Sequence, residues 1–522
     1  MDLGALGQEL RGSLTLYIQE PTGKQLTILP DPLGGGLVFT HEDADGWAAS
    51  SDLAALVSLL RMMGKEPRKS FSYVAAYVAT GSGGLIESSY EGVNVLPQYS
   101  YVTIQPGRVQ LCEYASAESL FAPEVAYGEA LDQVEGDIVR NVVAVAESSH
   151  ARKVAHLTGG VDSRILLSAI LAAGKAHEFV FYCSGGPTEP DQIIARQLAS
   201  EYGLTMTKHP GLEYEVLPET LEEQLLQPFK QTSGIISGPA LGGMRPSPHL
   251  IASGGYGELF RSFYNRGATF TGGSQEAAAH MFGALGFSPD PTRRILADGF
   301  MHDMAGSVAG IMGGASIVGV RDDALMDFVY LNRRNRYYVG EISRSVSEFS
   351  ARVDPLYSVA GASFGLRTEG RLRNANVIGV DLIERFTPGL AHLPFDSDKL
   401  GGIYAAVRGP QKVNTFSRGG VPSYDAPAKV TPLNGGNVKA ARLSATDIQR
   451  ANELRMSPRL MAQFPQIQSG LRELVANVPP SVFDSTFNRK VVDTLIRRTP
   501  SNRVQYRTAR DLYAGLLWYS HG

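Results

Sequence analysis

Hydrophobic residues divide the chain into a first part with short alternating runs and a longer second part in which strands and helices alternate. Within the first 125 residues, apolar or alternating runs at 13–18, 36–40 and 100–104 are separated by turn residues. This pattern is typical of β-strands. One helix is expected near 53–63. We therefore predict a largely β domain over residues 1–125.

The second part, from residue 126, combines helical periodicity with short apolar runs. Helices are expected at 129–147, 161–173 and 191–202, and strands at 154–157 and 178–183. Strands that alternate with helices predict a doubly wound parallel sheet whose ligands bind at its carboxyl edge. From about residue 275 the chain is mainly helical and glycine-rich. The expected fold class is α/β, with a second domain over 126–522 that ends in a helical part.

The loop between the first strand of that domain and its helix has the residues that a pyrophosphate needs. It reads Leu157-Thr158-Gly159-Gly160-Val161-Asp162-Ser163. The two glycines allow a sharp turn and a close approach to a ligand. Two hydroxyls and the first free N–H groups of the helix favour an anion there. Asp162 cannot bind phosphate itself, but it can hold a Mg²⁺ that bridges phosphates. We predict that this loop binds ATP with its metal.

The loop at 157–163 and two further motifs lead to a known family. The loop at 157–163 lacks the lysine of the Walker P-loop. It resembles instead the Ser-Gly-Gly-x-Asp-Ser loop of the ATP pyrophosphatases, which cleave ATP between the α- and β-phosphates. A second loop, 253–261, follows the apolar run 250–252 and resembles the Ser-Gly-x-Gly-Ala-Asp-Glu-Leu-Phe loop of the asparagine synthetase family. This resemblance implies that Ser253 and Gly255 also bind the nucleotide. Segment 350–356 resembles the family's Glu-x-Arg-Val-Pro-Phe-Leu-Asp, with a displaced proline.

The N-terminal domain resembles the glutaminase domain of the same family at 31–34, 51–56 and 96–107. That glutaminase needs a cysteine as the first residue of the mature chain, because its thiol is the nucleophile. Here position 2 is Asp2, and the nearest cysteine is Cys112. We therefore expect a degenerate glutaminase-like domain of the N-terminal nucleophile type. The amine must then come from the substrate rather than from glutamine.

Family branches without a glutaminase include β-lactam synthetases, carbapenam synthetase and lasso-peptide cyclases. The β-lactam synthetases use a Tyr–Glu pair as base, a lysine that stabilises the transition state, and a Tyr-x-x-Asp whose acid is the second Mg²⁺ ligand. The resemblance implies these roles for Tyr338 and Glu369, for Lys429, and for Glu341 beside Asp162.

Some of these assignments have alternatives. Tyr337 can replace Tyr338, and Lys412 or Lys399 can replace Lys429.

The expected activity is adenylation of a substrate carboxylate, with release of pyrophosphate, followed by attack of an amine of the same small molecule to close a lactam. Alternatives are macrolactam closure of a lasso-type peptide, intermolecular amide ligation, and nucleotide binding without catalysis. The presence of Asp162, Ser163 and Glu258 argues against the last of these. A Gly-x-Ser-x-Gly match at Ser363, with His392 downstream, suggests a hydrolase, but the apolar run before it is short for a nucleophile elbow.

Composition narrows the partners and the location. The chain has 522 residues, a net charge of −4 and 19% charged residues, which gives no reason to expect nucleic acid or an anionic membrane as partner. No window holds eighteen apolar residues, and the N-terminus lacks a basic segment followed by a long apolar one. Two cysteines cannot form a disulfide framework. We expect a cytoplasmic protein that takes a small molecule bearing a carboxylate and an amine, and we leave a homodimer open.

Overall fold

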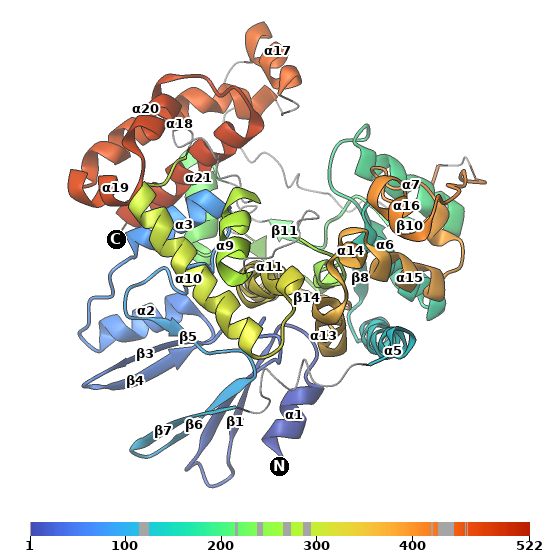
Figure 1. The fold of residues 1–522 in the computed structure, drawn as a ribbon, viewed down its shortest axis with the longest axis horizontal. Coiled ribbons are helices and arrows are strands. Elements are labelled where there is room, and N and C mark those ends of the chain that lie inside the picture. Colours follow the sequence, from blue (N-terminus) through green and yellow to red (C-terminus); the bar gives the residue numbers. More distant parts are fainter. Residues whose placement is uncertain are drawn as a thin grey trace.

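The computed structural model describes residues 2–113, 125–214, 218–236, 244–264, 273–284, 294–418, 421–425, 443–454, 456 and 458–521. The fold is mixed α/β, with a six-stranded parallel sheet and smaller antiparallel sheets. Figure 1 shows the N-terminal strands and the C-terminal helices on one side of the molecule and the α/β part on the other. The predicted α/β class is confirmed at this level.

The N-terminal part contains two antiparallel sheets and three helices. One sheet has the order β1 (Thr15–Gln19), β2 (Leu26–Pro30), β6 (Ser100–Gln105), β7 (Arg108–Glu113), and the other β4 (Gly46–Ser50), β3 (Phe39–Asp43), β5 (Asn94–Val95). The helices are α1 (Leu3–Glu9), α2 (Leu53–Met62) and α3 (Phe71–Thr80). The predicted helix near 53–63 is confirmed as α2. The run predicted at 36–40 is strand only from Phe39 onward.

The long parallel sheet has the order β14 (Ala351–Val353), β13 (His249–Ala252), β8 (Arg152–His156), β9 (Phe179–Tyr182), β10 (Thr205–Thr207), β15 (Ser423–Tyr424). All its pairs are parallel. The chain starts at β8, runs outward through β9 and β10, and then returns to lay β13 on the other side of β8. The order therefore reverses between β8 and β13. Ligands of open α/β sheets bind at the carboxyl ends of the strands at such a point.

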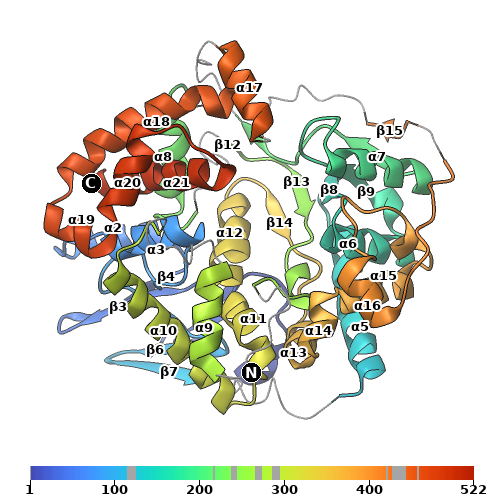
Figure 2. The same ribbon diagram turned by 45° about the horizontal axis from the view of Figure 1, so that its top comes forward.

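Helices cover this sheet on both faces. Ile251 of β13 packs with Val346 of α12 (Glu341–Ser347), whereas its neighbours Leu250 and Ala252 belong to the main core. Figure 2 shows α5 (Tyr127–Ala146), α6 (Val161–Ala172) and α15 (Val377–Phe386) grouped beside β8 and β9, and these three helices pack on one another. Together with α7 (Pro190–Tyr202), α5 and α6 confirm the helices predicted in this part.

The C-terminal helices pack against the N-terminal part. They are α17 (Ala445–Glu453), α18 (Pro458–Asn477), α19 (Pro480–Thr486), α20 (Arg489–Arg497) and α21 (Arg503–Ser520). Helix α21 contacts α3, α18 and α8 (Leu221–Gln231). One continuous hydrophobic core includes buried residues from both ends of the chain, such as Val74 and Leu516. The two ends therefore stabilise each other.

The remaining elements are mostly helical after residue 273, as predicted. The α-helices are α9 (Gly273–Ala284), α10 (Asp298–Ile317), α11 (Leu325–Val329), α13 (Val359–Arg367), α14 (Gly370–Asn374) and α16 (Gly402–Arg408). A π-helix, η5, spans Tyr330–Gly340. Short 3₁₀ turns are η1 (Ala176–Glu178), η2 (Gly257–Phe260), η4 (Asp322–Ala324) and η6 (Leu390–His392). Strands β11 (Glu213–Tyr214) and β12 (Met244–Arg245) form a separate antiparallel pair.

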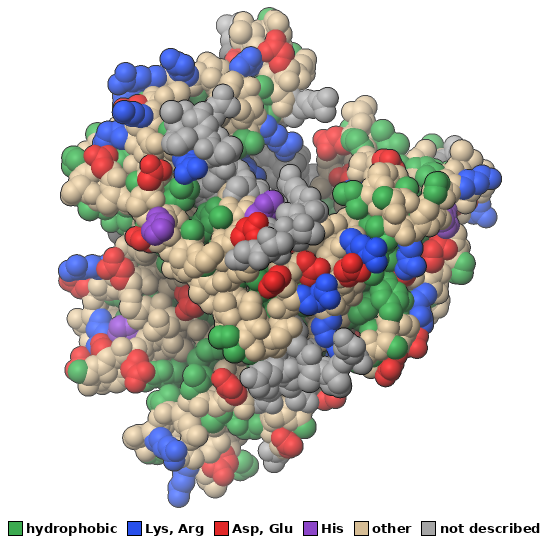
Figure 3. All heavy atoms as spheres, in the orientation of Figure 1, with side chains coloured by type: hydrophobic (Ala, Val, Ile, Leu, Met, Phe, Trp, Pro, Cys, Tyr) green, Lys and Arg blue, Asp and Glu red, His purple; other side chains and the backbone are tan. Residues whose placement is uncertain are grey.

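Acidic and basic side chains alternate over the face seen in Figure 3, with small apolar areas between them. Within the described residues, none of the helices combines the length and the apolar character that a membrane crossing requires.

Candidate active site

The loop after β8 is shaped by its own hydroxyls. Helix α6 begins directly after Gly160, whose N–H donates to Thr158 Oγ1 at 3.2 Å. The Ser163 hydroxyl lies 2.9 Å from Thr158 Oγ1 and accepts from the Thr158 N–H at 3.1 Å. Leu157, the residue before this turn, is fully buried. These contacts hold the start of α6 open toward the carboxyl edge of the sheet.

Gly159 makes the closest contacts of this loop with other segments. Its N–H donates to Asp191 Oδ1 at 2.8 Å, and its carbonyl accepts from the Asp396 N–H at 3.0 Å. A Cβ at this position would lie 2.7 Å from the Asp396 Cβ, so only glycine fits. Lys399 forms an ion pair with Asp396 at 3.4 Å. The structure thus places a lysine beside the glycine loop that precedes α6.

The loop after β13 packs directly against the first turn of α6. A Cβ at Gly257 would lie 2.6 Å from the Asp162 Cβ, and one at Gly254 would lie 3.1 Å from the Asp162 carbonyl carbon. Glycines at both positions allow the two loops to meet. The reversal of strand order between β8 and β13 therefore brings two glycine-rich loops together at Asp162.

Two carboxylates share one arginine at this meeting point. Arg261 donates to both oxygens of Asp162, at 3.0 and 3.3 Å, and its Nη2 lies 3.8 Å from Glu258 Oε1. Glu258 Oε2 is buried without a hydrogen-bond partner among the described residues. Burial, with the nearby Asp162 charge, raises the pKa of Glu258 to about 7. An acid with an unused buried oxygen is ready to accept a cation.

Ser253 and Gly255 line the other edge of this loop. The Ser253 hydroxyl donates to Asp354 Oδ1 and accepts from the Gly255 N–H at 3.2 Å. Arg352 donates to the same hydroxyl at 2.9 Å. A Cβ at Gly255 would clash with the Asp354 carboxylate. Both residues therefore lie at the predicted site, where a buried ion pair fixes the Ser253 side chain.

Tyr256 connects this loop to the N-terminal part. It has a positive φ of 69°, which is uncommon for a residue with a side chain. Its hydroxyl lies 2.8 Å from Ser13 Oγ, and its ring lies 4.8 Å from the ring of Tyr357. Tyr357 in turn donates to Asp31 Oδ1 at 2.8 Å. Residues of the N-terminal part thus hold the strained loop in place.

The π-helix η5 carries an aromatic stack toward the same site. Arg334 lies between the rings of Phe263 and Tyr338, 5.1 and 4.9 Å from their centroids. Tyr330, one turn earlier, lies 4.5 Å from the Phe263 ring. Phe263 also lies 5.9 Å from the Arg261 guanidinium. π-Helices are rare and are frequent at functional sites. Tyr338, 40% exposed, forms the outer end of this stack.

Among the other predicted catalytic residues, the structure describes Glu369 and the alternative Tyr337, and each has partners of its own. Tyr337 is buried, points to the N-terminal part and donates to the Glu87 carbonyl at 2.5 Å. Glu369 pairs with Arg371 at 2.9 Å, directly before α14. None of the contacts found among the described residues joins Glu369 to Tyr338. Lys429 lies outside the described residues, and Lys412 is exposed.

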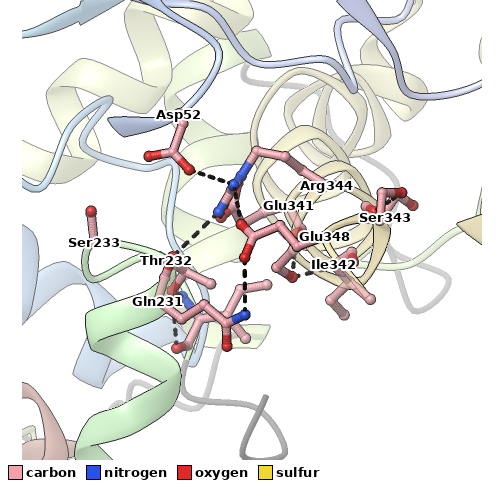
Figure 4. A network of polar contacts seen from close by, with 12 residues as sticks. Asp52, Gln231, Thr232, Ser233, Glu341, Ile342, Ser343, Arg344 and Glu348 are labelled. Carbon is pink, nitrogen blue, oxygen red and sulfur yellow. Dashed lines mark hydrogen bonds and ion pairs between the residues drawn. The ribbon is translucent and has the colours of Figure 1, made fainter. Parts of the chain in front are cut away.

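Glu341 belongs to a different network, shown in Figure 4. Its side chain is 1% exposed, and both its oxygens accept from Arg344 at 2.7 to 3.0 Å. Arg344 also contacts Asp52 at 2.6 Å and Glu348 at 2.9 Å. Arg261 joins Asp162 to Glu258, whereas none of the contacts among the described residues joins Asp162 to Glu341. Glu258 was named from the sequence without a role as metal ligand, and its position in the loop after the strand that lies next to β8 is the signal that points to that role.

The hydrolase alternative lacks its structural context. Ser363 lies within helix α13, which begins after the cap residue Ser358. A nucleophile elbow places its serine on a sharp turn from strand to helix. The Gly-x-Ser-x-Gly match is therefore a helical segment.

A divalent cation fits the pair Asp162 and Glu258. Mg²⁺ is usually held by one or two carboxylates together with substrate phosphates. In the parts of the chain that the structure describes, no three His, Cys, Asp or Glu side chains converge as a metal site of their own. A scan against models of known protein families found no match, and a search among curated proteins found no significant relative.

Proposed function

We propose that the chain is an ATP-dependent synthetase that activates a substrate carboxylate by adenylation and releases pyrophosphate. The observation that carries this proposal is the meeting of Asp162 and Glu258 across the reversal of strand order, beside the glycine turn that opens α6. An anion is favoured at the free N–H groups of such a helix start.

The residues around this point suit the charges of the reaction. Free N–H groups at the start of α6 would bind the phosphates, and Asp162 with Glu258 would hold Mg²⁺, which supplies positive charge to neutralise them. Lys399, beside Gly159 through Asp396, is a fixed cation for developing negative charge. This contact supports the Lys399 alternative, and Lys429 lies outside the described residues.

The amide-forming half of the proposal rests on the resemblance to asparagine synthetases without a glutaminase. An amine of the same small molecule would attack the acyl-adenylate and close a lactam. Peptide macrolactam closure and intermolecular ligation are the alternatives. Tyr338 stands exposed at the outer end of the Arg334 stack, within reach of a substrate, which supports a role in accepting the proton of the amine. None of the contacts among the described residues joins Glu369 to Tyr338, and Glu369 pairs with Arg371 instead.

The proposal assigns a supporting role to residues 1–125, as a glutaminase-like scaffold without glutaminase activity. Asp2 caps helix α1, accepting from the Gly4 and Ala5 N–H groups at 3.0 and 3.1 Å. Measurable release of glutamate from glutamine by the purified chain would contradict the assignment.

The products of ATP test the main proposal. With Mg²⁺ and a panel of amino acid and peptide carboxylates, ³¹P NMR should show AMP and pyrophosphate. ADP and phosphate as the products, or nucleotide binding without any turnover, would contradict it. Asp162→Asn should lower AMP formation by about 100-fold or more, on the scale of a lost transition-state charge contact. Glu348→Gln, on the Arg344 network, is the matched control and should keep the activity of the native chain.

A further inference from the structure

Arg261 occupies the place where a metal would bind. Its Nε and Nη2 use both oxygens of Asp162, and Nη2 is the nearest cation to Glu258 at 3.8 Å. With both carboxylates ionised, this group of one guanidinium and two carboxylates carries one net negative charge.

A divalent cation and this guanidinium compete for the same oxygens. A metal needs lone pairs of Asp162 that now accept from Arg261, and two cations a few ångströms apart repel each other. A metal that arrives alone must therefore displace the guanidinium. The Arg261 side chain is only 28% exposed, so a displaced guanidinium would lose its charged partners in a partly buried place.

Comparison with a second buried arginine shows how Arg261 differs. Arg373 donates to Asp327 and to the carbonyls of Thr368 and Asp323, and its side chain is 1% exposed. Among the described residues, the polar partners of Arg261 are the two carboxylates, one at a long distance, and Glu258 Oε2 has no hydrogen-bond partner there. Arg373 is thus saturated by carbonyl and carboxylate oxygens, whereas Arg261 can exchange its partners at little cost.

We propose that Arg261 makes metal binding depend on the nucleotide. This inference rests on the proposed adenylation site. When metal and nucleotide arrive together, the metal takes Asp162 and Glu258, and the phosphates give the guanidinium a new anionic partner. Guanidinium and phosphate form paired, charge-assisted hydrogen bonds, so the exchange keeps every charge matched. Arg261 is a positioning residue that couples the two ligands, and coupling of this kind is reciprocal.

The test measures Mn²⁺ binding by electron paramagnetic resonance, with and without a non-hydrolysable ATP analogue. The native chain should bind Mn²⁺ alone weakly and at least about tenfold more tightly with the analogue. In Arg261→Met, Mn²⁺ alone should bind about tenfold more tightly than in the native chain, because its competitor is gone. The analogue should then tighten Mn²⁺ binding by less than in the native chain, because only the direct phosphate ligands of the metal still couple the two.

Controls separate this inference from the proposed function. Arg321→Met removes an arginine that contacts Asp323 through the same two nitrogen atoms, at 3.0 and 3.1 Å, and should leave Mn²⁺ binding unchanged. Arg261→Lys keeps a charge and should retain part of the coupling. If Arg261→Met binds Mn²⁺ no more tightly than the native chain while the coupling persists, the inference fails alone. If the native chain binds no Mn²⁺ with the analogue, the proposed function fails with it.

Discussion

Two groups in this molecule each combine one arginine with an aspartate and a glutamate. One is Arg261 with Asp162 and Glu258, and the other is Arg344 with Glu341 and Asp52. In both groups, burial raises the pKa of the glutamate to about 7. Residue type and a raised glutamate pKa therefore do not distinguish a ligand site from a structural contact.

Saturation of the hydrogen bonds does distinguish them. Both oxygens of Glu341 accept from Arg344, which also joins α12 to the cap of α2 and, through the Gln231 carbonyl at 3.3 Å, to α8. Glu258 has an unpaired oxygen and lies among glycines at the carboxyl edge of the sheet. A satisfied network holds elements together, and an unsatisfied one at a strand end is open to a ligand.

The largest expected loss of stability comes from the group of Arg344, Glu341 and Asp52. Arg344→Met should lower the free energy of unfolding by about 3–5 kcal/mol, because it leaves the Glu341 carboxyl buried without its ion-pair and hydrogen-bond partner. Urea unfolding measures the loss. Adding Glu341→Met should recover much of it by removing the unpaired polar group.

Urea unfolding of a variant in the Arg261 group sharpens the comparison. Arg261→Met should lower the free energy of unfolding by only about 1 kcal/mol, because the side chains of Asp162 and Glu258 are each 22% exposed. Equal losses in the two variants would show that both groups are structural.

The third prediction uses the pKa of Glu341. Its pKa rises from 4.5 to about 7 on folding, so between these values the folded state binds the proton more strongly than the unfolded state. Stability should therefore fall as pH rises from about 4.5 to 7, by up to about 1.4 kcal/mol per pH unit from this group. Urea unfolding of the native chain and of Glu341→Gln at pH 5, 6 and 7 isolates the contribution as their difference. A difference that does not change with pH would contradict the assignment.

A further small effect concerns the contact between the N-terminal part and the candidate site. Ser13→Ala removes the hydroxyl 2.8 Å from that of Tyr256 and should cost about 1 kcal/mol, the usual size of one hydrogen bond. Because Tyr256 belongs to the β13 loop, nucleotide affinity measured by calorimetry should fall with it. Ser58→Ala, which removes an exposed hydroxyl bonded within α2, should change neither quantity. A loss of stability with unchanged nucleotide affinity would separate the N-terminal part from the site.

Local patterns predicted much of the fold well, because they depend on neighbours in the chain. The helical spacing over 129–147 and the strand–turn–helix from 152 onward appear in the structure as α5, β8 and α6. Helix α3 was missed, because its run of aromatic and apolar residues has no polar face. It is buried on nearly all sides by packing that includes α21, about 430 residues later in the chain.

The candidate site was only partly predictable. The sequence by itself determined the glycine turn, the position of Asp162 at the start of a helix and the presence of a second glycine-rich loop, because these follow from spacing within a few residues. Only the tertiary structure decided that Glu258 and Arg261 meet Asp162, and that Glu341 is held by Arg344. The physical reason is the order of the parallel strands: β13 returns to lie beside β8, and this long-range pairing is not encoded in any local pattern.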